Sequence, residues 1–233
     1  MVWRAGYCAV VNPAAQPPAR TAFTLIELLV VVFIGLIIFA SAWPTQKGVK
    51  VRSNQVRCQN QLRQIGLGLV MYAQDHKEGF PWQVATDVAG PDDFGSAAGQ
   101  FAKLTNYLAT PRLFLCPDDK QRAEATNFAA FHNVNLSYFA ALVSMSPGSN
   151  QPGMEILAGD RHLSFATKPL PAGLVVIREA RAMNWTEDLH FNPKSGAMGN
   201  MLFLDGHTEH VPALQLWQIF EASGNNTNRL LMP

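Results

Sequence analysis

One carboxylate, that of Glu27, interrupts a long apolar run near the amino terminus. The run extends from Phe23 to Trp43, and only Thr24, Glu27 and Ser41 are polar among these 21 residues. As a helix it would be about 30 Å long, which is enough to cross a bilayer. A carboxylate in such a span costs about 2.5–3.5 kcal/mol at the bilayer centre. We therefore expect Glu27 to have a function.

The segment 23–31 reads Phe-Thr-Leu-Ile-Glu-Leu-Leu-Val-Val and follows a basic leader that contains no acidic residue. It resembles the amino-terminal signature of type IV pilins and of the pseudopilins of type II secretion. The resemblance implies that a prepilin peptidase cuts between Ala22 and Phe23, that the new amino group is methylated, and that Glu27 serves in assembly. The usual residue before the cut is Gly. Ala22 is small enough for the same protease pocket, at the risk of slower processing.

Two simpler interpretations of this segment are a conventional secretory signal and a plain single-span anchor. A secretory signal has a shorter apolar core and a small-residue cleavage site after it, whereas here the small-residue site lies before the run. A plain anchor explains the length and the flanks of the run but not Glu27, although an acid in a first helical turn is also mildly favoured by the helix dipole.

Cysteines suggest a covalent link in the exported part. Cys8 lies in the leader, which leaves Cys58 and Cys116 as an even pair in a compartment expected to be oxidising. A disulfide between them would contribute about 4 kcal/mol on the chain-entropy model. The alternative is two unpaired, partly buried thiols.

Histidines near the carboxyl end are the main candidates for metal or catalytic chemistry, together with nearby acids. Residues three apart on a strand point to opposite faces, so His207 and His210 would be a poor chelating pair. His207 and Glu209 share a face, but two side chains do not make a site. We expect a polar rim on a hairpin rather than a metal site, and we assign no role to His190.

Two adjacent acidic residues, Asp118 and Asp119, make calcium a possible ligand. Asp118 and Asp119 follow Pro117, and some pseudopilins bind calcium through acidic loops, so calcium is an open alternative to solvated turn residues. Asp160 and Arg161 suggest a local ion pair. The sequence has no Gly-rich phosphate loop and no Gly-x-Ser-x-Gly motif. We therefore expect neither an enzyme nor a bound cofactor.

Charge gives no reason to expect a nucleic-acid partner. The 233-residue chain has a net charge of +1, and the leader holds two of its basic residues and no acidic one. The remaining residues, 23–233, therefore carry a net charge of −1. A nucleic-acid-binding domain is usually strongly basic.

The elements expected around these residues define an α+β, pilin-like fold. Apolar residues at a spacing of three and four from Leu62 to Tyr72 predict a helix, which we extend over residues 24–75 with a bend at Pro44. We expect a helix at 101–108, strands at 112–116, 136–143, 155–158 and 174–177, a hairpin at 200–211 and a final helix after Pro212, in which Leu214, Trp217 and Phe220 share a face. The predicted regions are a leader at 1–22, the transmembrane half of the long helix at 23–45, its soluble half at 46–78 and a globular domain with an antiparallel sheet at 79–233.

The globular part adds a second resemblance, to a large pseudopilin-like bacterial family. The similar segments are Cys58–Gly66, Met71–Ala73, Leu115–Asp118, Asn135–Phe139, Gly159–Arg161 and Phe203–His207. The late motif of that family is His, nine residues, then Asp-Gly. Here fourteen residues separate His190 from Asp205, so no family role is carried over to His190.

Together these observations favour a structural subunit held in the cytoplasmic membrane by a single span, with its domain on the extracytoplasmic side. The expected partners are the prepilin peptidase, other pilin-like subunits and a secretion or pilus assembly platform. One alternative is a membrane-tethered binding module that uses a prepilin-type export signal. Another is an extracytoplasmic metal-dependent hydrolase.

Overall fold

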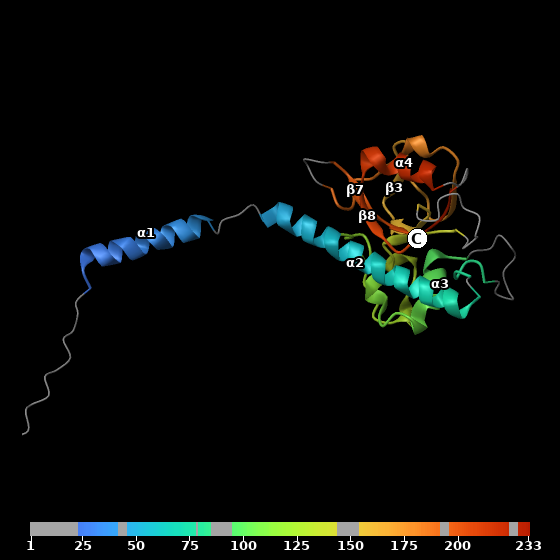
Figure 1. Cartoon of the computed structure of the whole chain (residues 1–233), viewed down its shortest axis with the longest axis horizontal. Helices are drawn as coiled ribbons and strands as arrows, with labels where there is room; N and C mark the ends of the chain where they lie inside the picture. Colours follow the sequence, from blue (N-terminus) through green and yellow to red (C-terminus); the bar gives the residue numbers. More distant parts are fainter. Residues whose placement is uncertain are drawn as a thin grey trace, which may run out of the picture. The chain divides into compact units, whose positions relative to one another are not determined.

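The chain divides into two compact units, Met1–Thr45 and Gln46–Pro233. The structure, a computed structural model, describes residues 23–41, 46–77, 79–84, 95–143, 154–191, 196–223 and 228–233, and it describes only the backbone of residues 41 and 46–51. The first unit contains one described helix, α1 (Leu25–Ser41), and the second begins with α2 (Gln46–Asp75) (Figure 1).

The described part of the helix predicted over residues 24–75 consists of α1 and α2, and residues 42–45, with Pro44, lie outside the described residues. Residues 23–45 were predicted to hold a membrane span. Among the described residues, no helix combines the length and the apolar character that a membrane span requires.

The second unit is an α+β domain built on an antiparallel sheet, as the sequence predicted. The strand order of the six-stranded sheet is β5-β9-β1-β2-β7-β8. Its strands are β1 (Tyr138–Ala141), β2 (Ile156–Asp160), β5 (Gly173–Ile177), β7 (Met198–Phe203), β8 (Thr208–Pro212) and β9 (Asn228–Met232). A smaller sheet of order β4-β3-β6 consists of β3 (Leu163–Phe165), β4 (Lys168–Pro169) and β6 (Met183–Trp185).

Short helical turns connect these strands, and two of them correct the sequence predictions. The predicted strand at 112–116 is a 3-10 helix, η2 (Pro111–Phe114), because Thr110 caps its first turn and Pro111 takes the first helical position. The helix predicted at 101–108 begins earlier, as α3 (Ala97–Ala102) with Ser96 as its cap, and continues as η1 (Lys103–Asn106). The other 3-10 turns are η3 (Phe128–Ala130), η4 (Asn133–Asn135) and η5 (Ala180–Ala182).

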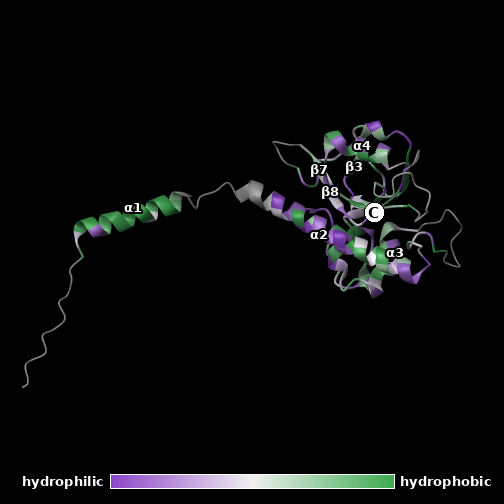
Figure 2. Ribbon diagram, viewed as in Figure 1, coloured by the Kyte–Doolittle hydropathy of each residue, from purple (hydrophilic) through white to green (hydrophobic). Residues whose placement is uncertain are grey.

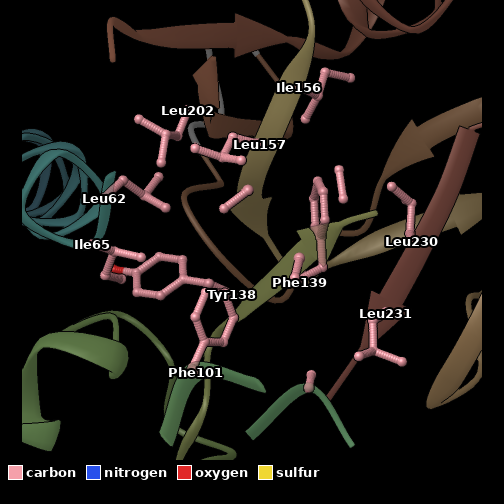
Figure 3. Close-up of a cluster of buried hydrophobic side chains, with 14 of the residues drawn as sticks. Leu62, Ile65, Phe101, Tyr138, Phe139, Ile156, Leu157, Leu202, Leu230 and Leu231 are labelled. Carbon is pink, nitrogen blue, oxygen red and sulfur yellow. The ribbon is translucent and has the colours of Figure 1, made fainter. Parts of the chain in front are cut away.

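The apolar row of α2 forms one wall of the core. Leu62, Ile65 and Leu69 are fully buried, as their spacing predicted, whereas Val56 is 51% exposed. Figure 3 shows Leu62 and Ile65 directed toward side chains of β1, β2 and β7. Contact is close, because a Cβ added at Gly66 would lie 3.0 Å from a methyl group of Leu202.

The opposite face of the same sheet packs against the smaller sheet. Leu202 faces α2, and side chains an odd number of positions away on β7 point to the other face. There, a Cβ added at Gly199 would lie 2.6 Å from the ring of Trp185 on β6. The Trp185 indole nitrogen donates to the carbonyl of Val211, 2.9 Å away. The ring is therefore held over Gly199.

The carboxyl-terminal elements confirm one prediction and correct another. The β7–β8 hairpin forms around Asp205 and Gly206, and Gly206 has a φ of +86° that favours glycine. Helix α4 (Ala213–Ala222) follows Pro212 as expected. Its buried residues are Leu216, Ile219 and Phe220, while Leu214, predicted to share the buried face, is 85% exposed.

We predict that Gly199→Ala destabilises the domain by about 1–3 kcal/mol, because the new methyl group would overlap the Trp185 ring and force repacking. Denaturant unfolding of the full chain followed by tryptophan fluorescence measures this. Gly99→Ala is the matched control. It lies in α3, where the added Cβ meets only the Ser96 hydroxyl, at 3.2 Å, and a helical Gly→Ala change is favourable by about 0.5–1 kcal/mol. Equal stability of the two variants would contradict the described packing.

Candidate functional site

The start of α1 places Glu27 in its first turn. The backbone amide of Glu27 donates to the Thr24 carbonyl oxygen at 3.1 Å, and the Thr24 hydroxyl lies 3.4 Å from the same amide. A threonine that accepts from the amide three residues later is a helix N-cap. Thr24 therefore caps the amino terminus of α1, and Glu27 lies in the first turn, where the helix dipole favours an anion.

The surface of α1 is apolar on every side. Its large apolar side chains are between 48% and 80% exposed, the lowest value being that of Val30 and the highest that of Leu25. In Figure 2 the helix is coloured as hydrophobic along almost its whole length. A helix that is hydrophobic all round is normally buried, and an apolar surface of this extent marks an interaction site.

The three residues predicted for processing and assembly differ in what the structure describes. Ala22 lies outside the described residues. Phe23 is 70% exposed, and Glu27 is exposed as well. Among the described residues, the Glu27 carboxylate has no hydrogen-bond or ion-pair partner. Cleavage after Ala22 and a role of Glu27 in assembly stay predictions.

A second candidate site lies inside the domain, where His190 stands between two carboxylates. Its Nδ1 is 3.3 Å from Oδ2 of Asp118, which follows η2, and its Nε2 is 3.4 Å from Oδ2 of Asp160, the last residue of β2. The side chains of His190 and Asp160 are completely buried. His190 also has a φ of +50°, an uncommon backbone conformation for a residue other than glycine.

Asparagines attach both carboxylates to the surrounding elements. The Asp160 carboxylate accepts from the backbone amide and the side-chain amide of Asn200 on β7, at 2.7 and 3.0 Å. The Asp118 carboxylate accepts from the side-chain amide of Asn54 on α2, at 2.8 Å. We call Asn54, Asp118, Asp160, His190 and Asn200 the polar cluster. It connects α2 to the central strands.

The two carboxylates shift the pKa of the His190 imidazole between them. Burial alone would disfavour the charged form of His190, but Asp160 and Asp118 outweigh it and raise the pKa of His190 above its ordinary value. Burial raises the pKa of Asp160, and the proximity of His190 lowers that of Asp118. His162, fully buried and near His190, has a pKa lowered to about 3 by burial and by the charge of His190. The two carboxylates therefore favour the protonated form of His190, whereas burial favours the neutral form of His162.

The neighbouring acid, Asp119, is also paired. Nε and Nη2 of Arg161 donate to its two carboxylate oxygens at 2.7 and 2.9 Å, and the Ser137 hydroxyl donates at 2.8 Å. The prediction of a local Asp160–Arg161 pair is thus wrong, because the two side chains bind different partners. Asp119 is 5% exposed, so it is not a solvated turn residue.

A disulfide borders the polar cluster. It joins Cys58 of α2 to Cys116, the pair that the sequence suggested, with Cα atoms 5.4 Å apart. Sγ of Cys116 is 3.4 Å from Nε2 of His190. The ligand atoms of Cys58, Cys116 and His190 lie within 4.8 Å of one another, and all three residues are buried. In the disulfide form the sulfurs are not thiolates, which are the form of cysteine that binds metals.

The hairpin histidines do not form a pair. The imidazole of His207 contacts the Asp205 carboxylate at the exposed turn. His210 Nδ1 is 3.2 Å from Oδ1 of Asn200, and burial lowers the pKa of His210. The two imidazoles therefore have separate partners, although only His210 lies on a strand, since β8 begins at Thr208.

Sequence reasoning missed the polar cluster, although one signal for it was present. Two of the segments used for the second resemblance, those ending at Asp118 and Arg161, supply Asp118 and Asp160. Their acidic residues could have indicated that the two segments meet in the fold.

Comparison with known proteins gives one finding. The prokaryotic N-terminal methylation motif matches residues 18–43. No curated protein and no solved structure matches the chain. The matched segment contains Ala22, Phe23 and Glu27 and most of α1. The second resemblance, to the family with the His-x9-Asp-Gly motif, stays a prediction. The recognition made from residues 23–31 is confirmed: the chain has the prepilin-type amino terminus of the type IV pilin-like proteins.

Proposed function

We propose that this chain is a pilin-like structural subunit, a pseudopilin, of a type II secretion or type IV pilus-like system. The observation that carries the proposal is the methylation motif at residues 18–43, together with the exposed apolar surface of the helix inside it. A structural role, rather than catalysis, is the function that such a helix serves.

Processing prepares the subunit. A prepilin peptidase removes residues 1–22, and methylation follows at the new amino group of Phe23. Before assembly, the apolar segment holds the protein in the cytoplasmic membrane by a single span, and residues 46–233 lie on the extracytoplasmic side. An assembly platform then collects the subunits.

Two features of α1 explain assembly: its exposed apolar surface and the Glu27 carboxylate. Its apolar surface is covered when helices of neighbouring subunits pack together, which replaces contacts with lipid. The Glu27 carboxylate pairs with the Phe23 ammonium of a neighbour. That pairing neutralises two charges that are each costly in a low-dielectric surrounding.

Cleavage is tested by the intact mass of the membrane-associated protein. We expect the loss of residues 1–22 and the gain of one methyl group. Ala22→Gly should be processed at least as fast as the unchanged chain, because Gly is the usual residue there, whereas Ala22→Leu should block cleavage by its size. A protein that retains Met1, or one cut after Ser41 or Ala42, rules out prepilin-type processing.

The second test concerns Glu27. Glu27→Gln should leave membrane insertion and the fold of the domain intact, since it removes a charge that lipid disfavours. It should reduce incorporation into fibres, because the neighbouring ammonium then has no partner. Cross-linking of subunits in membranes measures this, with Glu209→Gln as the control that removes an exposed carboxylate of the domain.

Equal cross-linked ladders for the unchanged chain and Glu27→Gln would remove Glu27 from assembly. If the ladders were absent from both, the chain would instead be a membrane-tethered binding module that uses a prepilin-type export signal.

A further inference from the structure

We propose that the chain, when its disulfide is reduced, binds one zinc ion through Cys58, Cys116 and His190. This inference is independent of fibre assembly. It starts from three buried residues whose ligand atoms already lie within 4.8 Å of one another, two cysteine sulfurs and an imidazole nitrogen. Two thiolates, an imidazole and one further ligand are a set typical of tetrahedral zinc.

Distances between the ligand atoms fit this geometry. With metal–ligand bonds of about 2.0–2.3 Å, the ligand atoms of a tetrahedral zinc site are about 3.3–3.8 Å apart. Sγ of Cys116 is 3.4 Å from Nε2 of His190. One edge of the tetrahedron is therefore present, and reduction allows the two sulfurs to move apart to form the others.

Asp160 borders this group of three residues. Its Oδ2 lies 3.4 Å from Nε2 of His190 and accepts two hydrogen bonds from Asn200, at 2.7 and 3.0 Å. With three protein ligands, the fourth position of a tetrahedral zinc ion is held by water.

Asp118 lies where it can orient the His190 ligand. A metal-binding histidine normally donates its other ring N–H to a carboxylate, which fixes its tautomer. Nδ1 of His190 faces Oδ2 of Asp118 at 3.3 Å, and Asn54 holds Asp118 in place. The left-handed backbone of His190, with its φ of +50°, is a further sign that the position of this ring is imposed by its surroundings.

Zinc binding requires that the Cys58–Cys116 disulfide first be reduced. A dithiol reductant transfers two electrons and two protons to the disulfide, which gives two cysteine thiols and the disulfide of the reductant. Zinc then displaces the two thiol protons and any proton on Nε2 of His190. The reduced chain is also the form made in a reducing cytoplasm before oxidation can occur.

The test uses the full chain in detergent, reduced with a phosphine that leaves no competing thiol, and incubated with zinc alone. After removal of free metal, elemental analysis should find one zinc per reduced chain and none above background in the oxidised chain. Cobalt substituted for zinc should give a sulfur-to-metal charge-transfer band. A reduced chain that takes up no zinc, or cobalt bound without that band, overturns the proposal.

Variants separate this site from adventitious binding at exposed histidines. His190→Gln should abolish stoichiometric binding, and Asp118→Asn should weaken the affinity by about 10–100-fold while one zinc per chain is retained at saturation. His207→Gln is the matched control and should bind like the unchanged chain, because His207 lies at the exposed hairpin turn.

Zinc uptake by His190→Gln equal to that of the unchanged chain would refute the site. If His190→Gln does not fold, as judged by near-ultraviolet circular dichroism, Asp118→Asn decides. An unchanged affinity in that variant would also refute the site. Slower alkylation of Cys58 and Cys116 in the presence of zinc gives an independent readout.

Discussion

The docking of α2 on the central sheet is the contact on which the rest of the domain depends. The helix contributes Leu62, Ile65 and Leu69 to the core, and Gly66 allows its backbone to approach Leu202 closely. A disulfide and an Asn54–Asp118 hydrogen bond attach its preceding turns. Apolar burial supplies most of the free energy of such docking, whereas the covalent and polar attachments determine which face of the helix is used.

The charges under α2 make this docking specific. Charged groups are expensive to bury, and removal of one partner from a buried ion pair costs about 3–5 kcal/mol, because it leaves the other charge uncompensated. Asp118 comes from the segment after η2, Asp160 from β2 and His190 from the segment after β6. All three must arrive together, so a misplaced α2 or a slipped strand would leave a buried charge unpaired.

Local sequence patterns correctly predicted elements whose structure depends on neighbouring residues, such as the core face of α2 and the β7–β8 hairpin. The period of the apolar residues gave the core face of α2, and Asp205-Gly206 gave the β7–β8 hairpin. The prediction failed where distant residues decide the structure. Strand β9 completes the sheet by pairing Leu231 with Ala140, and the buried face of α4 depends on what lies beneath it. The polar cluster was missed for the same reason, since no spacing in the sequence relates His190 to Asp118 or Asp160.

The two units differ in whether their apolar side chains are buried and their charged side chains have partners. This difference supports the proposed assembly. In the second unit, the apolar row of α2 is buried, and His190 lies between the carboxylates of Asp118 and Asp160. In α1, the apolar side chains are exposed and the Glu27 carboxylate has no partner among the described residues. The proposed assembly would give both groups a partner, because a helix of a neighbouring subunit offers an apolar face to α1 and a positive amino terminus to the Glu27 carboxylate.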